Sequence, residues 1–100
     1  MAEFLVYAEL NIPRDLDPAV LAEMQKREIE GGKAMAKAGS FIRMWRVPGR
    51  RATWNLFEAK DATALHEVLS SFALYPYFDM TVHPLAEHPR DPAIYANDKK

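Results

Sequence analysis

The chain contains no cysteine and only four glycines, and these gaps exclude two kinds of site. Without cysteine, neither a disulfide framework nor a thiolate metal site is available, and the redox compartment is left open. Gly31 and Gly32 lie inside a helical pattern, while Gly39 and Gly49 are isolated, so no glycine-rich loop for phosphate is present. The chemistry of this protein has to come from other side chains.

The sequence also lacks an excess of one charge. Its 13 Lys and Arg residues and 14 Asp and Glu residues are interspersed and give a formal net charge of −1, which is not the basic footprint of a nucleic-acid binder. Histidine is scarce, and His66, His83 and His88 are scattered without the spacing of metal ligands. We therefore expect no nucleic-acid partner and no metal site.

No apolar run is long enough to span a bilayer, and no basic segment leads into an apolar signal core at the N-terminus. We expect a soluble cytoplasmic protein that does not bind membranes. The 100 residues, 49% of them hydrophobic, predict one ordered domain with a modest core. Association with another chain would hide further apolar surface.

Residues 18 to 37 carry the clearest pattern in the chain, that of an amphipathic helix. Asp17 followed by Pro18 is typical of an N-cap and a first helical turn, and Gly39 suits the left-handed residue that ends a helix. Each glycine inside the helix costs roughly 1 kcal/mol relative to alanine, so another backbone element or a small molecule is expected to approach closely. One face is charged, and the other is an apolar stripe: Val20, Leu21, Met24, Gly31, Gly32 and Met35.

Glu28 lies near the middle of this apolar stripe. A carboxylate there lacks the solvation of the opposite face, so it has to be paired, partly protonated or directed into a cavity. We therefore predict that Glu28 faces a cavity and has a raised pKa. The alternative is a surface glutamate on a helix that is rotated slightly.

The remaining pattern predicts four strands and a second helix. Asp61 caps this helix, which covers residues 61 to 72, and Pro48 with Gly49 forms a turn between two strands. The order strand, helix, strand, strand, helix, strand predicts an α+β, ferredoxin-like βαββαβ fold with two helices on one face of a four-stranded antiparallel sheet. The predicted strands are residues 3 to 11, 40 to 47, 50 to 57 and 78 to 85.

We expect one domain over residues 1 to 89 and an extended C-terminal tail over residues 90 to 100, where the chain becomes polar and contains proline. The sheet face opposite the helices carries Trp45, Trp54 and other apolar side chains. A second copy of the chain is the simplest cover for this face, as in a dimeric α+β barrel. The sequence therefore predicts a homodimer at least.

Arginines are concentrated on the predicted hairpin of residues 40 to 57. A guanidinium group binds carboxylates well, so Arg43 and Arg46 are candidates for holding an acidic ligand. The alternative is a solvated sheet edge or tip, which applies most to Arg50 and Arg51. The loop of residues 75 to 77 either places its tyrosine rings over a pocket or plugs the core.

Several short motifs, taken in chain order, resemble the muconolactone isomerase family. The resemblance covers nearly the whole chain, and the joint spacing of the motifs is more specific than any one of them. The motifs are Asn11-Ile-Pro-Arg-Asp-Leu-Asp-Pro18, Glu28, Met44-Trp-Arg-Val-Pro-Gly49, Leu65-His66-Glu67 with Leu69, Tyr75-Pro-Tyr-Phe-Asp79 and His88-Pro89.

The resemblance implies ferredoxin-like subunits that pair into dimers and build larger rings, commonly decamers, without a metal or organic cofactor. It implies an enzyme of aromatic catabolism that moves a ring double bond in a butenolide bearing a carboxymethyl arm, or eliminates chloride from the chlorinated analogue. Glu28 aligns with the family's helix glutamate and would carry the proton. The tail after His88 would reach over a neighbouring subunit.

Four positions depart from the family pattern. Gln25 stands where the family usually has lysine, and Arg50, Arg51 and Thr53 stand where members have histidine or lysine, tyrosine and asparagine. The missing lysine and tyrosine would be expected to stabilise the dienolate oxygen or hold the lactone. We nominate Glu28 as the catalytic residue. The predicted substrate contacts are Gln25, Arg43, Arg46, Arg51, Thr53 and Tyr77.

Our interpretation is a cofactor-independent isomerase that acts on an acidic, muconolactone-type lactone by proton transfer. A first alternative is another small-molecule enzyme on this scaffold, such as a cyclase, a lyase or dehalogenase, or a cofactor-free oxygenase acting on an aromatic or polyketide-like compound. A second alternative is a non-catalytic ligand-binding or assembly protein, which the loss of the helix lysine favours. Turnover of a butenolide separates the isomerase from both.

Overall fold

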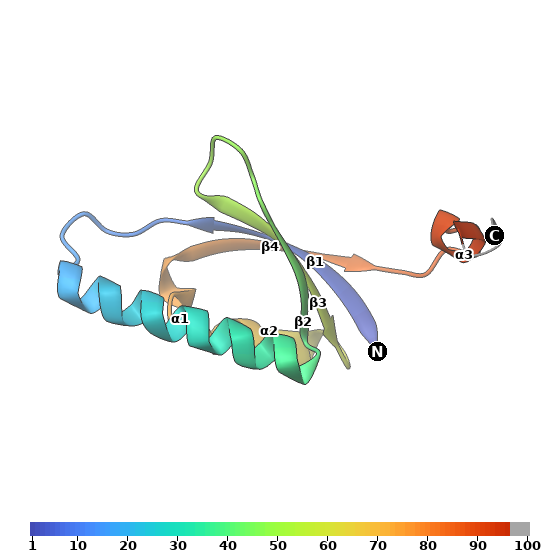
Figure 1. The fold of residues 1–100 in the computed structure, drawn as a ribbon, viewed down its shortest axis with the longest axis horizontal. Helices are drawn as coiled ribbons and strands as arrows, with labels where there is room; N and C mark the ends of the chain where they lie inside the picture. The colour runs from blue at the N-terminus through green and yellow to red at the C-terminus, as the bar shows by residue number, and fades with distance from the viewer. Residues whose placement is uncertain (97–100) are drawn as a thin grey trace.

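The computed structural model describes residues 1–96, which are built around one four-stranded antiparallel sheet. Two helices, α1 (Pro18–Ala38) and α2 (Ala62–Ser70), lie on one face of this sheet (Figure 1). The predicted ferredoxin-like βαββαβ fold is confirmed. The strands are β1 (Ala2–Leu10), β2 (Phe41–Arg46), β3 (Ala52–Ala59) and β4 (Phe78–Leu85), in the order β2-β3-β1-β4.

Helix α1 begins and ends where the sequence predicts. Asp17 Oδ1 accepts a hydrogen bond from Ala19 N at 2.8 Å, and Gly39 closes the helix with a φ of 87°. Val20 was predicted to lie on the inward stripe, but it is 47% exposed because the first turn of α1 extends past the sheet (Figure 1). The less exposed residues of α1 are otherwise those of the predicted stripe: Leu21, Met24, Glu28, Gly31, Gly32 and Met35.

The packed core lies under α2 rather than under α1. None of the residues of α1 is fully buried, and the β1 and β3 positions near its span include the small Ala8 and Ala52. Helix α1 therefore spans an open space above the sheet instead of closing down on it. The buried cluster consists of Phe4, Val6, Phe57, Ala59, Leu65 and Leu69.

A bulge in β2 decides which of its side chains face the helices. The pairing of β2 with β3 shifts between Phe41 and Arg43, so Ile42 lies in the irregular position. Arg43 and Trp45 consequently lie on the open face of the sheet, whereas Phe41 and Arg46 lie on the helix side.

The open face of the sheet has no cover within residues 1–96. Tyr7 and Trp54 are in edge contact there with ring centroids 5.0 Å apart, and His83 lies 5.7 Å from Trp54 by the same measure. Trp45, on the same face, is 41% exposed. An uncovered aromatic surface of this kind is what the predicted homodimer would hide.

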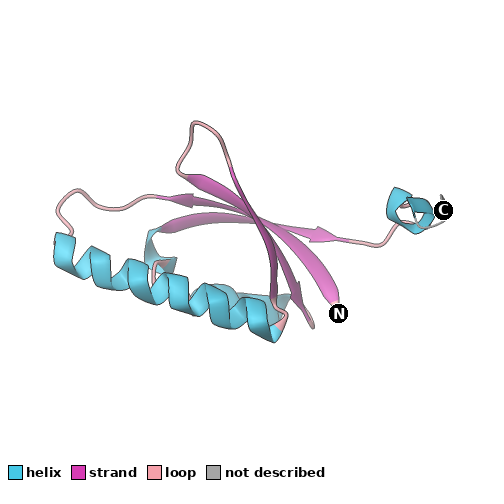
Figure 2. Cartoon of the chain, in the orientation of Figure 1, coloured by secondary structure: helices cyan, strands magenta, loops and turns pink. Residues whose placement is uncertain are grey.

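After β4 the chain leads away from the sheet to α3 (Pro92–Ala96), as Figures 1 and 2 show. We predicted extended backbone for this tail, and that is wrong for residues 92–96. Asp91 Oδ1 accepts a hydrogen bond from Ala93 N at 3.0 Å, and Pro92 occupies the first turn, so the segment has its own cap. Residues 97–100 of the predicted tail lie outside the described residues.

Candidate active site

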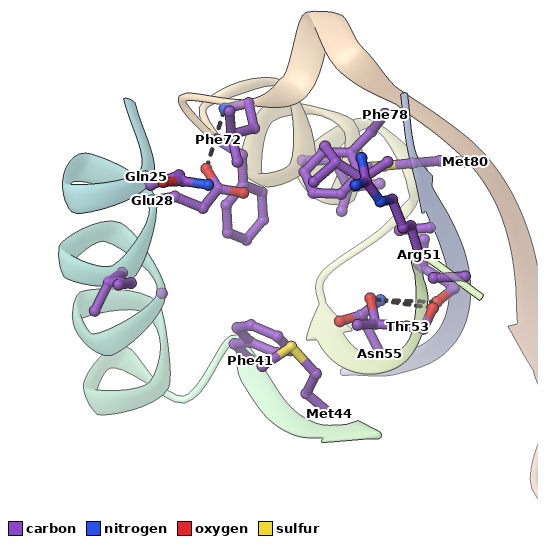
Figure 3. Close-up of a pocket in the computed structure, with 18 of the residues that line it drawn as sticks. Gln25, Glu28, Phe41, Met44, Arg51, Thr53, Asn55, Phe72, Phe78 and Met80 are labelled. Atoms are coloured by element: carbon purple, nitrogen blue, oxygen red, sulfur yellow. Dashed lines mark hydrogen bonds between the residues drawn. The ribbon is translucent and has the colours of Figure 1, made fainter. Parts of the chain in front are cut away.

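A cavity of about 1120 Å³ lies between α1 and the helix side of the sheet. In Figure 3, Gln25 and Glu28 lie on the α1 side, and Thr53 and Asn55 lie on β3 opposite. A concave, mainly apolar space with a few polar groups is typical of a small-molecule site. The apolar lining includes Phe41, Met44, Phe57, Phe72, Phe78 and Met80.

Glu28 is half-buried in the cavity wall, and it is the only acidic side chain among the described residues that line the cavity. Burial raises the pKa of Glu28 above its ordinary value, while backbone hydrogen bonds from Leu74 and Ala73 oppose that rise. The bond from Leu74 N to Glu28 Oε1 measures 3.1 Å and is drawn in Figure 3. The predicted cavity-facing position and raised pKa are confirmed. A carboxyl group tuned in this way is suited to proton transfer.

The two glycines of α1 adjoin open space. A Cβ built on Gly31 or Gly32 would meet no atom within 4 Å, so the close backbone approach that we considered is not present in the described chain. Gly32 lines the cavity and Gly31 does not. The missing side chain at Gly32 therefore enlarges the space beside Glu28, which is one helical turn away.

Cationic side chains border the cavity. Arg46 and Arg51, both predicted as ligand contacts, are in the lining together with Arg14 and Lys33. The one salt bridge found within residues 1–96 joins Arg50 to Glu9, so these four cations are unpaired there. A cationic rim over an apolar interior favours a ligand with an acidic group.

Of the two remaining predicted contacts on the hairpin and the loop, Arg43 borders the cavity and Tyr77 does not. Arg43 borders the cavity, but its guanidinium carbon lies 4.9 Å from the ring centroid of Trp45 on the open face, because the bulge turns it away. Arg50 also borders the cavity, and its exposed Nη2 lies 3.3 Å from Glu9 Oε1, which fits the solvated hairpin tip expected for this residue. Tyr77 lies in the short 3-10 helix η1 (Tyr75–Tyr77) and is not in the cavity lining. Its backbone N–H donates to Leu74 O at 2.9 Å, and its carbonyl oxygen accepts from Asn11 N at 2.8 Å.

The comparisons with known proteins show the family of the chain. The sequence profile described as muconolactone delta-isomerase matches residues 2–91. The chain belongs to the muconolactone delta-isomerase family. The muconolactone delta-isomerase of Rhodococcus opacus is 34% identical over 91% of this chain and 98% of its own length. Its counterpart in Pseudomonas aeruginosa is 31% identical over 96% of this chain and 98% of its own.

A solved structure supports the same assignment at the level of the fold. A crystal structure of muconolactone isomerase superposes with a TM-score of 0.83 and 30% sequence identity, and the match covers 89% of this chain and 93% of that one. The resemblance to the muconolactone delta-isomerase family that the sequence motifs indicated is therefore confirmed. Gln25 and Thr53, two of the departures from the family pattern, both line the cavity.

Asn55 also lines the cavity, and it was not among the site residues predicted from the sequence. It is 6% exposed and is the only buried polar side chain in the described chain. Its Nδ2 donates to Val6 O at 3.1 Å and to Thr53 Oγ1 at 2.9 Å. An amide at an inward position of an apolar strand, next to Phe57 on the same face, was the available signal.

Within residues 1–96, no group of three or more His, Cys, Asp or Glu side chains is placed to hold a metal ion. The helices in this range also include none that is long and apolar enough to cross a membrane.

Proposed function

We propose that this protein is a cofactor-independent isomerase that moves a ring double bond in an acidic, muconolactone-type butenolide. The observation that carries the proposal is the position of Glu28, a half-buried carboxyl group of raised pKa in an apolar cavity with a cationic rim. Membership of the muconolactone delta-isomerase family supplies the reaction class.

The proposed reaction needs one group that takes and returns a proton. Glu28 removes the proton from the ring carbon that bears the side arm, and the electron pair of that C–H bond moves into a dienolate with negative charge on the lactone oxygen. The protonated Glu28 then delivers the proton to the carbon next to the lactone carbonyl. No electrons are gained or lost, so a single positioned carboxyl group meets the requirement.

The cationic rim orients the substrate in this proposal. Arg46 borders the cavity from β2, and Arg51 borders it from the position just before β3. Their guanidinium groups suit the carboxylate of the side arm. Gln25, one turn before Glu28 on α1, contributes an uncharged polar contact where the family usually has lysine. The acidic arm and the ring would thus be held at different walls of the cavity.

The proposed active form is a homo-oligomer. The open face with Trp45 and Trp54 supports pairing of two subunits. Helix α3 lies beyond the end of its own sheet (Figure 1) and carries Ile94 and Tyr95, which are 54% and 50% exposed. We infer that the tail contacts a neighbouring subunit. Larger rings, including decamers, are compatible with this arrangement.

The test is turnover of muconolactone and its chlorinated analogue in deuterium oxide, followed by deuterium incorporation at the ring carbons. We expect Glu28→Gln to keep its fold and oligomeric state and to lower turnover by about 10² to 10⁴, the usual effect of removing a positioned acid or base. Glu30→Gln, an exposed position on the same helix, is the matched control and should retain activity. Exchange by Glu28→Gln at the wild-type rate would remove Glu28 from the mechanism.

A further inference from the structure

We infer that the hydroxyl group of Thr53, held in place by Asn55, donates the hydrogen bond that stabilises the lactone oxygen of the dienolate. The inference rests on the proposed function. It assigns Thr53 a role at the reacting atoms and makes Asn55 a positioning residue. The resemblance to the family implies that a lysine and a tyrosine would stabilise this oxygen, and the chain lacks both.

The orientation of the Asn55 amide follows from its neighbours. Val6 O and Thr53 O lie 3.1 and 3.3 Å from Asn55 Nδ2, and both are carbonyl oxygens, which can only accept hydrogen bonds. The amide nitrogen must therefore face them, and Oδ1 must face away. Asn55 is 6% exposed, so these contacts hold its amide in place.

This orientation fixes the role of the Thr53 hydroxyl. Thr53 Oγ1 lies 2.9 Å from Asn55 Nδ2, and because an amide nitrogen only donates, Oγ1 must accept. The hydroxyl proton then has to point elsewhere. Within residues 1–96 no hydrogen bond is donated by this hydroxyl, and Thr53 lines the cavity, so the proton is available to a ligand there.

The surroundings of Thr53 suit an oxygen that becomes negative during the reaction. Arg46 pairs with Thr53 across β2 and β3, and Arg51 lies two residues before it. Figure 3 shows Thr53 and Asn55 on the β3 wall with Glu28 on the α1 side, so a ring between them can lose a proton to one wall and gain a hydrogen bond from the other. A donor fixed in advance and partly shielded from water stabilises such an oxygen more than a mobile one does.

The experiment compares Thr53→Val, Thr53→Ser, Asn55→Leu and the double variant Thr53→Val with Asn55→Leu. Thr53→Val keeps the branched shape and removes only the donor, so kcat should fall by about 10² with a much smaller change in KM, as expected for a contact made mainly in the transition state. Thr53→Ser keeps the hydroxyl and should retain most of the activity. Thr81→Val, on the open face of β4, is the matched control and should leave kcat unchanged.

The double variant tests whether Asn55 acts through Thr53. Asn55→Leu should lower kcat to a similar degree, and the double variant should be no slower than Thr53→Val alone, because the two residues serve one hydrogen bond. An active wild type with unchanged kcat in Thr53→Val, or multiplied losses in the double variant, would overturn this inference and leave the proposed function intact. A wild type that turns over no butenolide would overturn both. The two Thr53 variants decide the donor role even if Asn55→Leu fails to fold.

Discussion

Glu28 loses part of its solvation where it enters the cavity wall, and the hydrogen bond from Leu74 N compensates only in part. Its pKa is therefore higher in the folded chain than in the unfolded chain, and the folded chain holds the Glu28 proton more tightly. The stabilisation that this proton gives is complete below the ordinary glutamate pKa and is lost as the pH rises through the raised value. The same desolvation that suits Glu28 for proton transfer thus destabilises the fold near neutral pH.

At the residue scale, the first prediction is that Glu28→Gln raises the free energy of unfolding at pH 7 by up to about 1 kcal/mol, a modest value because solvent still screens a half-buried group. The gain should shrink toward pH 4, where wild-type Glu28 becomes protonated. Urea unfolding at both pH values and one fixed protein concentration measures it. Glu30→Gln is the control. A difference between Glu28→Gln and wild type that does not depend on pH would contradict desolvation as the cause.

A second prediction at this scale uses two arginines of β2 that lie on opposite faces of the sheet. Arg46→Gln should raise KM for an acidic lactone about tenfold, which corresponds to the loss of one charge-assisted hydrogen bond. Arg43→Gln removes the same charge from the same strand, but at a guanidinium that lies over Trp45, and should leave KM within twofold of wild type. Steady-state kinetics of both variants decides the matter, and equal effects would point to a general electrostatic field instead of a specific contact.

At the element scale, the features that short-range patterns determine could be predicted from the sequence. The cap at Asp17, the glycine at Gly39 and the helical period placed α1 and its inward stripe, because each depends on neighbours a few residues away. Strand β2 was harder to predict. An unbroken period of two puts Phe41 and Arg43 on one face, and the bulge at Ile42 separates them. That bulge is the physical reason why the guanidinium of Arg43, a residue that borders the cavity, lies over Trp45 on the open face.

The side-chain contacts of the site depend on residues far apart in the chain, so fewer of these contacts could be predicted from the sequence. Glu28 is held by Leu74 N, and Asn55 is held by Val6 O, across separations of 46 and 49 residues. The sequence identified Glu28 because a carboxylate interrupts an apolar stripe, and the same reasoning applied to β3 would have found Asn55. For Tyr77, no local signal distinguished a ring over the cavity from one beside it.

Helix α1 offers a matched pair of substitutions at neighbouring glycines. Gly31→Ala and Gly32→Ala should each stabilise the fold by about 0.5 to 1 kcal/mol through helix propensity, since nothing lies within 4 Å of either added Cβ. Only Gly32 lines the cavity, so only Gly32→Ala should raise KM, while Gly31→Ala should leave it unchanged. Thermal unfolding and steady-state kinetics report the two effects. Destabilisation by both would mean that another element covers this face of α1 in the assembled protein.

At the scale of the whole molecule, the single chain has more surface than a stable monomer of its size. Its accessible area is 7568 Å² at 11.4 kDa, against about 5800 Å² expected from the scaling of folded monomers. Its radius of gyration is 15.9 Å, against about 13 Å for a compact domain of 100 residues. The projecting tail and the thinly covered sheet account for both excesses. Association is therefore expected for stability as well as for function.

The last prediction concerns which surface forms the first contact between subunits. If two copies pair through the open face, Trp45→Glu should disrupt the pairing, because it places a charge among aromatic side chains that association would desolvate. Light scattering at micromolar concentration should show a dimer or a larger oligomer for wild type and a smaller species for Trp45→Glu. Lys26→Glu, an exposed position on α1, is the control for a change of charge and should form an oligomer of the same mass as wild type.

A wild type that is monomeric under these conditions would refute the homo-oligomer. An oligomer that stays intact in Trp45→Glu would instead assign the contact to α3 or to the outer side of α1. The far-ultraviolet circular dichroism of Trp45→Glu separates loss of assembly from loss of fold, because the cluster under α2 lies on the other side of the sheet and should keep its structure.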